Sequence, residues 1–179
     1  MKYSKKHVFS VLVFSVFLLV SFQGCSKKDS NPAAPEEKTN PYFTGTATLT
    51  LNGSGYSNKV LSSNTSTAGY SDEYKGTVVV AYVSAASDSA TAMIVFPGKA
   101  TGNFSWKGIV TEENVARWDG VSLTYGVEKI YVPVSGETKI TSYGNVGQNI
   151  EGTFSGKMKE MTSGNEVSVS GSFKSKRVE

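Results

Sequence analysis

The sequence predicts an all-β protein whose main domain is an antiparallel β-sandwich of about eight to ten short strands. Three observations lead to this prediction. Apolar and polar residues alternate with a period of two in many short segments after residue 42. Clusters of Gly, Asn and Ser separate these segments, as turns do. The 179-residue chain also contains 18 glycines, and the strand-favouring Val, Tyr and Phe outnumber Leu.

The first hairpin is expected at residues 43–61. In FTGTATLTL, residues 43–51, every second residue is apolar or glycine and threonines fill the positions between, which is the pattern of a half-buried strand. Asn52-Gly53-Ser54-Gly55 supplies turn residues, and YSNKVL can return as the second strand. The next segment, SSNTSTAGYSDEY at 62–74, is polar and rich in Ser and Thr, and it is predicted to be a loop.

The middle of the chain predicts two paired strands and one short helix. TVVVAYV, residues 77–83, is apolar on both faces and is typical of a central strand. AMIVF at 92–96 is its expected neighbour, ended by Pro97-Gly98. A short helix is expected at TEENVAR, residues 111–117, because Thr111 can cap the helix start and the two glutamates suit its positive end.

The C-terminal part predicts five strands. GVSLTY at 120–125 and KIYVPV at 129–134 form an expected hairpin, and Pro133 suggests that the second of these strands lies at a sheet edge. KITSY, 139–143, is expected as a separate short strand. The clearest alternation lies in two further strands within 150–174. A domain of about 135 residues can bury a core without disulfide bonds.

The N-terminus has the layout of a secretory signal. Residues 1–7 carry three lysines, residues 8–22 form an apolar run without charge, and Gln and Gly then lead to Cys25, the one cysteine of the chain. The 15-residue run is shorter than the roughly 20 residues that a transmembrane helix needs. We therefore expect residues 1–24 to be a cleaved signal peptide, and an uncleaved anchor helix is the alternative.

The residues before the cysteine, Phe22-Gln23-Gly24-Cys25, resemble the lipobox of bacterial lipoproteins, in which Leu and a small residue precede Gly or Ala and then Cys. Gly24 and Cys25 match this pattern, whereas Phe22 and Gln23 depart from its commonest residues. The resemblance implies that the Cys25 sulfur carries diacylglycerol, that a signal peptidase cuts before this residue, and that the new amine is acylated. Two or three acyl chains anchor a protein stably. The alternative is a secreted protein with a free cysteine at this position.

Residues 25–41 are predicted to form a lipidated, flexible tether. They include three prolines, charges of both signs and no large apolar side chain, so they cannot bury a core. Ser26 follows the cysteine where an Asp would imply inner-membrane retention in lipoproteins, so the resemblance favours the outer membrane. The expected order is a signal peptide at 1–24, this tether, and a β-sandwich domain at 42–179. The sequence leaves open whether the domain faces the periplasm or the cell surface.

The C-terminal half resembles a pattern common in uncharacterised Bacteroidetes-type lipoproteins. The matching segments are FPGKATG at 96–102, SYGNVGQNIEGTFSG at 142–156 and VSVSGSF at 167–173, within a resemblance that covers roughly half of the mature chain. Asn149 stands where those proteins usually have an aromatic residue. The pattern carries no established activity, so it implies an extracellular β-sandwich and no particular chemistry.

The residue types that most enzymes and metal sites use are scarce. The one histidine, His7, lies in the predicted signal peptide, and lipidation would consume the only thiol. Ser-His-Asp and Cys-His catalysis, His- or Cys-based zinc sites and common haem ligation are therefore excluded for the mature chain. Carboxylates remain at Asp72-Glu73, Asp88 and Glu112-Glu113, but no pattern sets an acid against a base. We expect no enzyme activity, cofactor or metal, and a carboxylate-based hydrolase is the third-ranked alternative.

Aromatic residues give the remaining signal of a binding site. Arg117-Trp118-Asp119, with Trp106 a short distance upstream, has the residue types of sugar-binding sites, in which Trp or Tyr stacks on a pyranose ring and Asp or Arg orients it. The alternative is that the two tryptophans are core residues. The candidate ligand-binding residues are thus Trp106, Arg117, Trp118 and Asp119.

These observations together predict a membrane-anchored, non-catalytic module that binds a glycan or a protein. Removing residues 1–24 takes away three of the 18 basic residues and no acid, which leaves 15 of each sign. A mature chain so close to neutral gives no reason to expect nucleic-acid binding. The alternative function is a structural or assembly lipoprotein of the cell envelope without a small-molecule site.

Overall fold

The computed structural model describes residues 43–86, 88–112, 115–126 and 129–179. These residues form eleven strands and no helix. The predicted signal peptide, Cys25 and the tether lie outside the described residues. The strands are β1 (Thr46–Gly53), β2 (Tyr56–Ser63), β3 (Ser66–Ser71), β4 (Gly76–Ala85), β5 (Asp88–Pro97), β6 (Gly102–Ser105), β7 (Gly108–Glu112), β8 (Val115–Tyr125), β9 (Lys129–Tyr143), β10 (Asn149–Glu160) and β11 (Glu166–Arg177).

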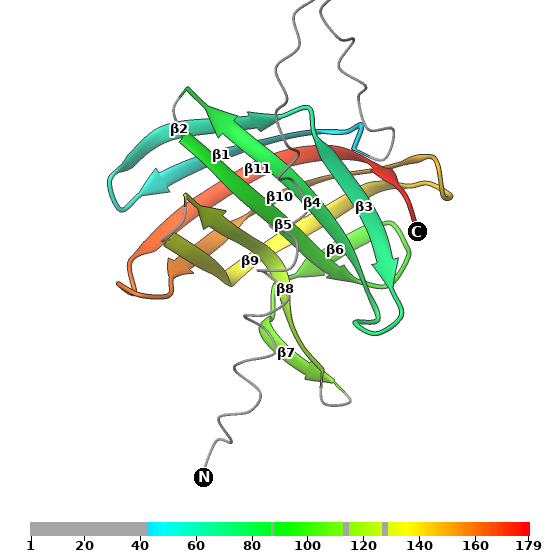
Figure 1. Cartoon of the computed structure of the whole chain (residues 1–179). Coiled ribbons are helices and arrows are strands. Elements are labelled where there is room, and N and C mark those ends of the chain that lie inside the picture. Colours follow the sequence, from blue (N-terminus) through cyan, green and yellow to red (C-terminus); the bar gives the residue numbers. More distant parts are fainter. Residues whose placement is uncertain (1–42, 87, 113–114, 127–128) are drawn as a thin grey trace, which may run out of the picture. The chain divides into compact units, whose positions relative to one another are not determined.

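The strands form one large sheet that folds over into two layers. Its hydrogen-bonded order is β6-β9-β10-β11-β1-β2-β4-β5-β8-β7, and β8 also pairs with β9. Strands β3, β4, β5 and β8 thus lie in front of a second layer formed by β9, β10, β11, β1 and β2 (Figure 1). All strand pairs are antiparallel except β3 with β11. The predicted antiparallel, sandwich-like fold is confirmed.

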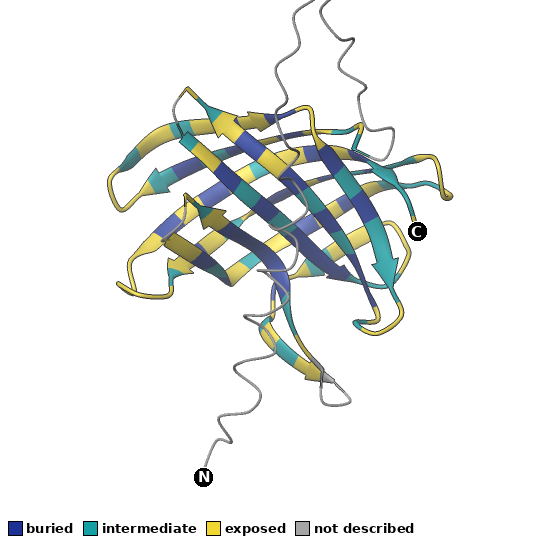
Figure 2. Cartoon of the chain, in the orientation of Figure 1, coloured by how far each residue is buried: buried dark blue, intermediate teal, exposed yellow. Residues whose placement is uncertain are grey.

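The core lies between the two layers. Buried residues alternate with exposed ones along the strands (Figure 2). In β1, Leu49 and Leu51 are at most 1% exposed, while the threonines beside them face outward, as the period-two pattern predicts. Close packing explains one glycine at a strand centre. A Cβ at Gly171 would lie 2.5 Å from Cζ of Phe154, so only glycine leaves room for that ring.

Two segments differ from the sequence-based expectation. Residues 62–74, expected as a loop, contain strand β3, because the small residues there can face the core: Ser66 is fully buried and its hydroxyl is hydrogen-bonded to that of Ser175 at 2.8 Å. Residues 111–117, expected as a helix, instead belong to the β7–β8 hairpin, with Thr111 opposite Ala116. Strand pairing there outweighs a local capping signal, which is worth only about 1 kcal/mol.

Strand β9 joins two segments that were expected to be separate. It runs without interruption from Lys129 to Tyr143 and pairs with β10 on one side and with β6 and β8 on the other. Strand β9 as a whole is therefore not an edge strand, which corrects the expectation. Pro133 itself lies between the residues that pair with β8 (129–131) and those that pair with β6 (137–140), so its ladder pairing is with β10 alone. The pairing register shifts beside Pro133, which is opposite Met158, and such an irregularity accommodates a residue that cannot donate to the ladder.

Candidate functional site

Trp106 is a core residue. Its side chain is 7% exposed, and its Nε1 donates a hydrogen bond to Oγ1 of Thr138 at 2.9 Å. The indole packs directly on two glycines, since a Cβ at Gly156 or Gly136 would lie 2.4 or 2.7 Å from its ring carbons. No face of the ring is left for a sugar, which corrects the expectation that Trp106 is offered to a ligand.

Arg117 and Asp119 form a buried ion pair on β8. Their side chains are 8% and 2% exposed, and Nε of Arg117 lies 2.7 Å from Oδ1 of Asp119. Arg117 also donates through Nη1 to the carbonyl oxygen of Tyr74 at 2.5 Å, which ties β8 to the turn between β3 and β4. Within the described residues, Oδ2 of Asp119 has no hydrogen-bond partner. The pair holds the fold together and is not open to a ligand.

Trp118 keeps part of its surface exposed. It is half-buried on the β7–β8 hairpin, opposite Ile109, which is 67% exposed. The four predicted residues are therefore near one another in the chain but do not form a shared binding surface.

A different cluster lies at the opposite end of the domain, where the β1–β2, β4–β5 and β8–β9 turns meet. Tyr56 begins β2, Tyr125 ends β8 and Tyr131 is near the start of β9. The ring centroid of Tyr56 lies 5.7 Å from that of Tyr125 and 6.4 Å from that of Tyr131, and the hydroxyls of Tyr56 and Tyr131 are hydrogen-bonded at 3.1 Å. Tyr131 is 1% exposed, whereas the other two rings are half-buried.

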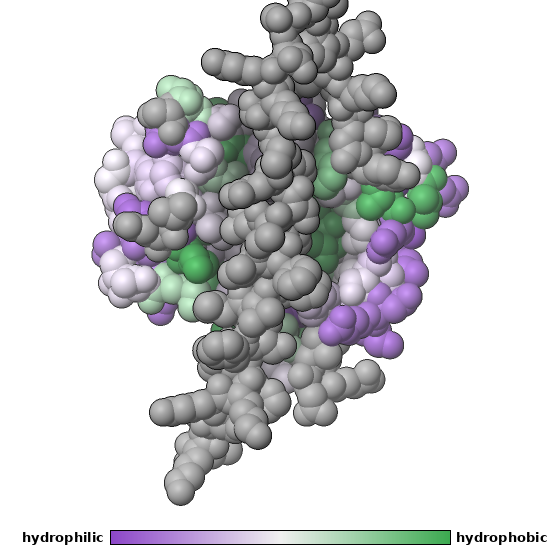
Figure 3. Space-filling view, viewed as in Figure 1, coloured by the Kyte–Doolittle hydropathy of each residue, from purple (hydrophilic) through white to green (hydrophobic). Residues whose placement is uncertain are grey.

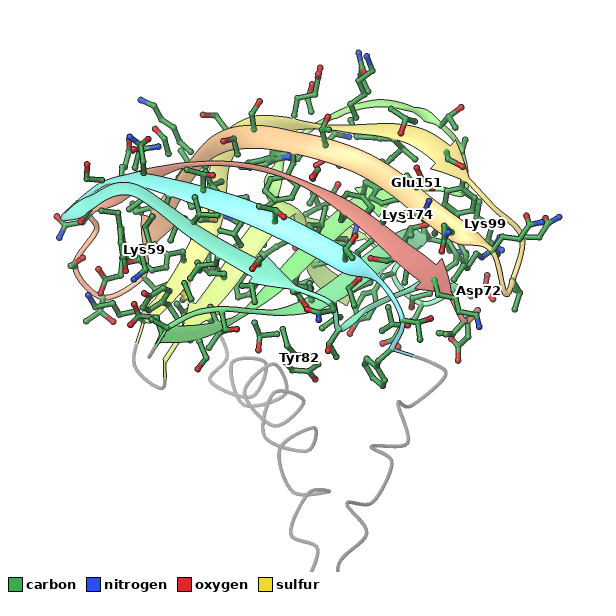
Figure 4. All side chains as sticks on the ribbon, turned by 90° about the horizontal axis from the view of Figure 1, so that it is seen from above. Lys59, Asp72, Tyr82, Lys99, Glu151 and Lys174 are labelled. Carbon is green, nitrogen blue, oxygen red and sulfur yellow. The ribbon has the colours of Figure 1, made fainter. Side chains whose placement is uncertain are left out.

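An ion pair completes this cluster. Nζ of Lys59 on β2 donates to Oδ2 of Asp88 on β5 and so links the two layers. Both side chains are about one-third exposed, at 32% and 35%. Tyr125 lies close enough to Asp88 to contribute to the lowering of the pKa of that carboxyl. We call these five residues, Tyr56, Lys59, Asp88, Tyr125 and Tyr131, the tyrosine end. Figure 4 shows Lys59 at this end, away from Asp72 and Lys99 at the other.

The neighbours of each group shift its protonation. The hydrogen bond between Lys59 and Asp88 is the main reason why the pKa of Lys59 is raised and that of Asp88 is lowered, against the opposing effect of burial. Burial, and then the neighbouring carboxylate of Asp88, raises the pKa of Tyr125. Burial likewise raises the pKa of Tyr131, with a further contribution from its bond to Tyr56.

This arrangement is suited to binding rather than proton transfer. Because Asp88 is ionised and paired at neutral pH, it can accept hydrogen bonds but is a poor general acid or base there. The half-buried rings of Tyr56 and Tyr125 offer apolar faces beside that charge. In the described part of the chain, no group of three or more His, Cys, Asp or Glu residues could hold a metal ion.

Sequence reasoning named Asp88 only as one carboxylate among several and missed its partners. One signal was present in YSNKVL: Lys59 is two residues before the buried Leu61, so both side chains lie on the inward face of the strand. A charged residue at an inward position near a strand end indicates a polar cluster. Which residues meet it depends on the topology, since Tyr56 and Tyr131 are 75 residues apart in sequence.

Comparison with protein-family models, with curated proteins and with solved structures found no match for this chain. No helix in the described part of the chain has the length and apolar character needed to cross a membrane.

Proposed function

We propose that this protein is a lipid-anchored, extracytoplasmic lipoprotein whose β domain is a non-catalytic binding module for glycans, with the tyrosine end as its binding surface. The mature chain would begin at Cys25, carry lipid on that residue, and hold the domain at the outer membrane through residues 26–41. The observation that carries the binding role is the combination, at one end of the domain, of half-buried tyrosine rings with the Lys59–Asp88 pair.

Each component suits a sugar. The C–H faces of a pyranose pack on tyrosine rings, and its hydroxyls exchange hydrogen bonds with charged groups. Asp88 and Lys59 supply an acceptor and a donor that are already fixed by their mutual bond, so little side-chain entropy is lost on binding. Tyr131 supports the site from below, because its buried hydroxyl fixes that of Tyr56.

The anchor is supported by the sequence alone, through the signal-like residues 1–24 and the lipobox-like residues before Cys25. A protein ligand in place of a glycan would use the same end. The alternative, a structural lipoprotein without a small-molecule site, requires only the anchor and a stable domain.

A glycan-binding screen followed by titration calorimetry tests the proposal. The full chain with Cys25→Ser would be compared with the same chain carrying Tyr125→Ala, and with Tyr82→Ala as the control, since Tyr82 is a 43% exposed tyrosine outside the tyrosine end. We expect glycan binding that Tyr125→Ala weakens and Tyr82→Ala leaves unchanged. Absence of binding to any envelope glycan, with the fold intact by circular dichroism, would favour the structural alternative.

A further inference from the structure

The two outer faces of the domain differ in chemistry. The outer face of β10, β11 and β1 presents exposed hydroxyl and charged side chains, including an ion pair between Lys174 and Glu151 at 2.9 Å. The flanking strands β2 and β9 also expose three apolar side chains, Val60, Ile130 and Val134. Two neighbouring rows across this face are Thr48, Ser172 and Thr153, and Thr50, Ser170 and Ser155. This is the surface expected of a sheet that faces water.

The outer face of β4 and β5 is apolar. Alternate residues of β4 are buried in the core, so the residues between them, Val78, Val80 and Tyr82, face outward. On β5, Met93 lies opposite Val80 and Val95 opposite Val78, so these two share that outward face. We call these five residues the apolar outer face. This explains why β4 is apolar on both faces: its inward-facing residues fill the core, and its outward-facing residues form part of the apolar outer face.

These side chains lie on the side opposite the hydroxyl rows. Val95 is buried, the other aliphatic members are half-buried, and Tyr82 is 43% exposed. Figure 4 shows Tyr82 on the opposite side of the domain from Glu151 and Lys174. Figure 3 views the domain from the side of β4 and β5 and shows green, hydrophobic residues beside white and purple ones on the described surface. The five residues are contiguous on two paired strands, and a contiguous apolar patch indicates a partner for its face.

The chain enters the domain at the edge of this face. Phe43, the first described residue, packs against Tyr82 with ring centroids 6.3 Å apart. Residues 26–42, which precede it, contain prolines, charges and no large aliphatic side chain, so they have little apolar surface with which to cover valines. A flexible linker of about 17 residues has a root-mean-square length of roughly 23 Å, so lipid on Cys25 would hold this edge of the domain close to the bilayer.

We propose that the apolar outer face rests on the lipid surface in which Cys25 is anchored, so that the domain lies on the membrane with its hydroxyl-rich face toward water. The inference depends on the proposed lipidation. A lipid surface suits this face because apolar side chains sink into the boundary between headgroups and acyl chains, and a tyrosine at the margin keeps its hydroxyl in the polar layer.

A second copy of the chain suits the face less well. A stable dimer buries about 800 Å² on each partner, contributed by roughly 20–30 residues. The apolar outer face has five residues, and the next outward position on β5, Thr91, is polar. A bilayer needs no matching surface, and the anchor already supplies most of the affinity.

The test places the mature lipidated protein in vesicles of phosphatidylethanolamine and phosphatidylglycerol. Because lipid occupies Cys25, a single introduced cysteine can carry an environment-sensitive fluorophore. Tyr82→Cys labels the apolar outer face and Ser172→Cys is the matched control on the opposite face, while Thr91→Cys, opposite Tyr82, replaces the first variant if that one fails to fold. We expect spin-labelled lipid to quench the Tyr82→Cys label several-fold more than the Ser172→Cys label.

Three results would overturn the inference. Equal quenching at the two positions, in protein whose intact mass includes the lipid, would place neither face on the bilayer while leaving the anchor intact. A Tyr82→Cys label that is shielded from water without lipid quenching, in a protein that sediments as a dimer, would assign the face to a second copy. An intact mass without lipid would refute the anchor itself, and the inference with it.

Discussion

Replacing Trp106 by alanine separates a core role for this residue from a ligand-binding role. Removing a buried tryptophan costs about 3–5 kcal/mol in protein cores. The variant also leaves Oγ1 of Thr138, on a residue with 0% exposure, without its donor, which adds about 1 kcal/mol. The structure therefore predicts that Trp106→Ala lowers the free energy of unfolding by about 4–6 kcal/mol, a large part of the total stability of a small domain.

The assay is urea unfolding of the full chain with Cys25→Ser, followed by far-ultraviolet circular dichroism. Trp118→Ala is the matched control, because that ring is half-buried on a hairpin and its removal should cost much less. Trp106→Phe should have an intermediate effect, since it keeps most of the packing and loses the hydrogen bond. A Trp106→Ala variant within about 0.5 kcal/mol of the parent, as for surface substitutions, would refute the core assignment.

Four further predictions follow from the described contacts. The pKa of Asp88 is lowered in the folded state, so this carboxylate stabilises the fold at pH above its ordinary pKa of 3.8. The stabilising effect is lost as pH falls through the pKa of the folded state. Asp88→Asn should therefore reduce the sensitivity of unfolding to acid. The pKa of Lys59 is raised, so the stabilising effect of this residue is lost as pH rises above 10.5. Lys59→Met should therefore reduce the sensitivity of unfolding to alkaline pH, measured from the free energy of unfolding as a function of pH. Gly156→Ala should destabilise the domain by about 1–3 kcal/mol, because its Cβ would lie 2.4 Å from the core indole; an unchanged melting temperature would contradict this. Arg117→Met should cost about 3–5 kcal/mol by leaving a buried carboxylate without its cation, and the double variant with Asp119→Leu should recover part of that loss in chemical unfolding.

The sequence predicts the fold well where alternation is strong. In residues 43–51 and 150–158 every second residue is apolar or glycine, and the residues between are hydroxyl-bearing or charged. In both segments the structure buries most residues of the apolar set. Strand β3 was missed because Ser66 and Ala68 are small, so their inward packing leaves no hydrophobic pattern. The expected helix at 111–117 rested on capping signals, which are local in sequence and cannot show that a strand partner is available.

The candidate site was harder to predict because it depends on contacts between residues that are distant in sequence. The burial of Trp106 follows from a cradle of glycines on β9 and β10, which nothing in the neighbouring sequence reveals. The tyrosine end forms because the β1–β2, β4–β5 and β8–β9 turns meet, and the sequence alone does not show which turns lie together in the fold. Asp88 was named from the sequence, but its role became clear only with Lys59 and Tyr125 beside it.

The intact mass of the protein from its native membrane fraction, measured beside a Cys25→Ser variant, tests the central proposal most directly. We expect a mature chain that begins at Cys25 and carries the added mass of diacylglycerol and an acyl chain, together with loss of this added mass and of membrane association in the variant. An unmodified thiol in a soluble fraction would contradict the proposal, and the domain would then be a secreted module without a lipid anchor.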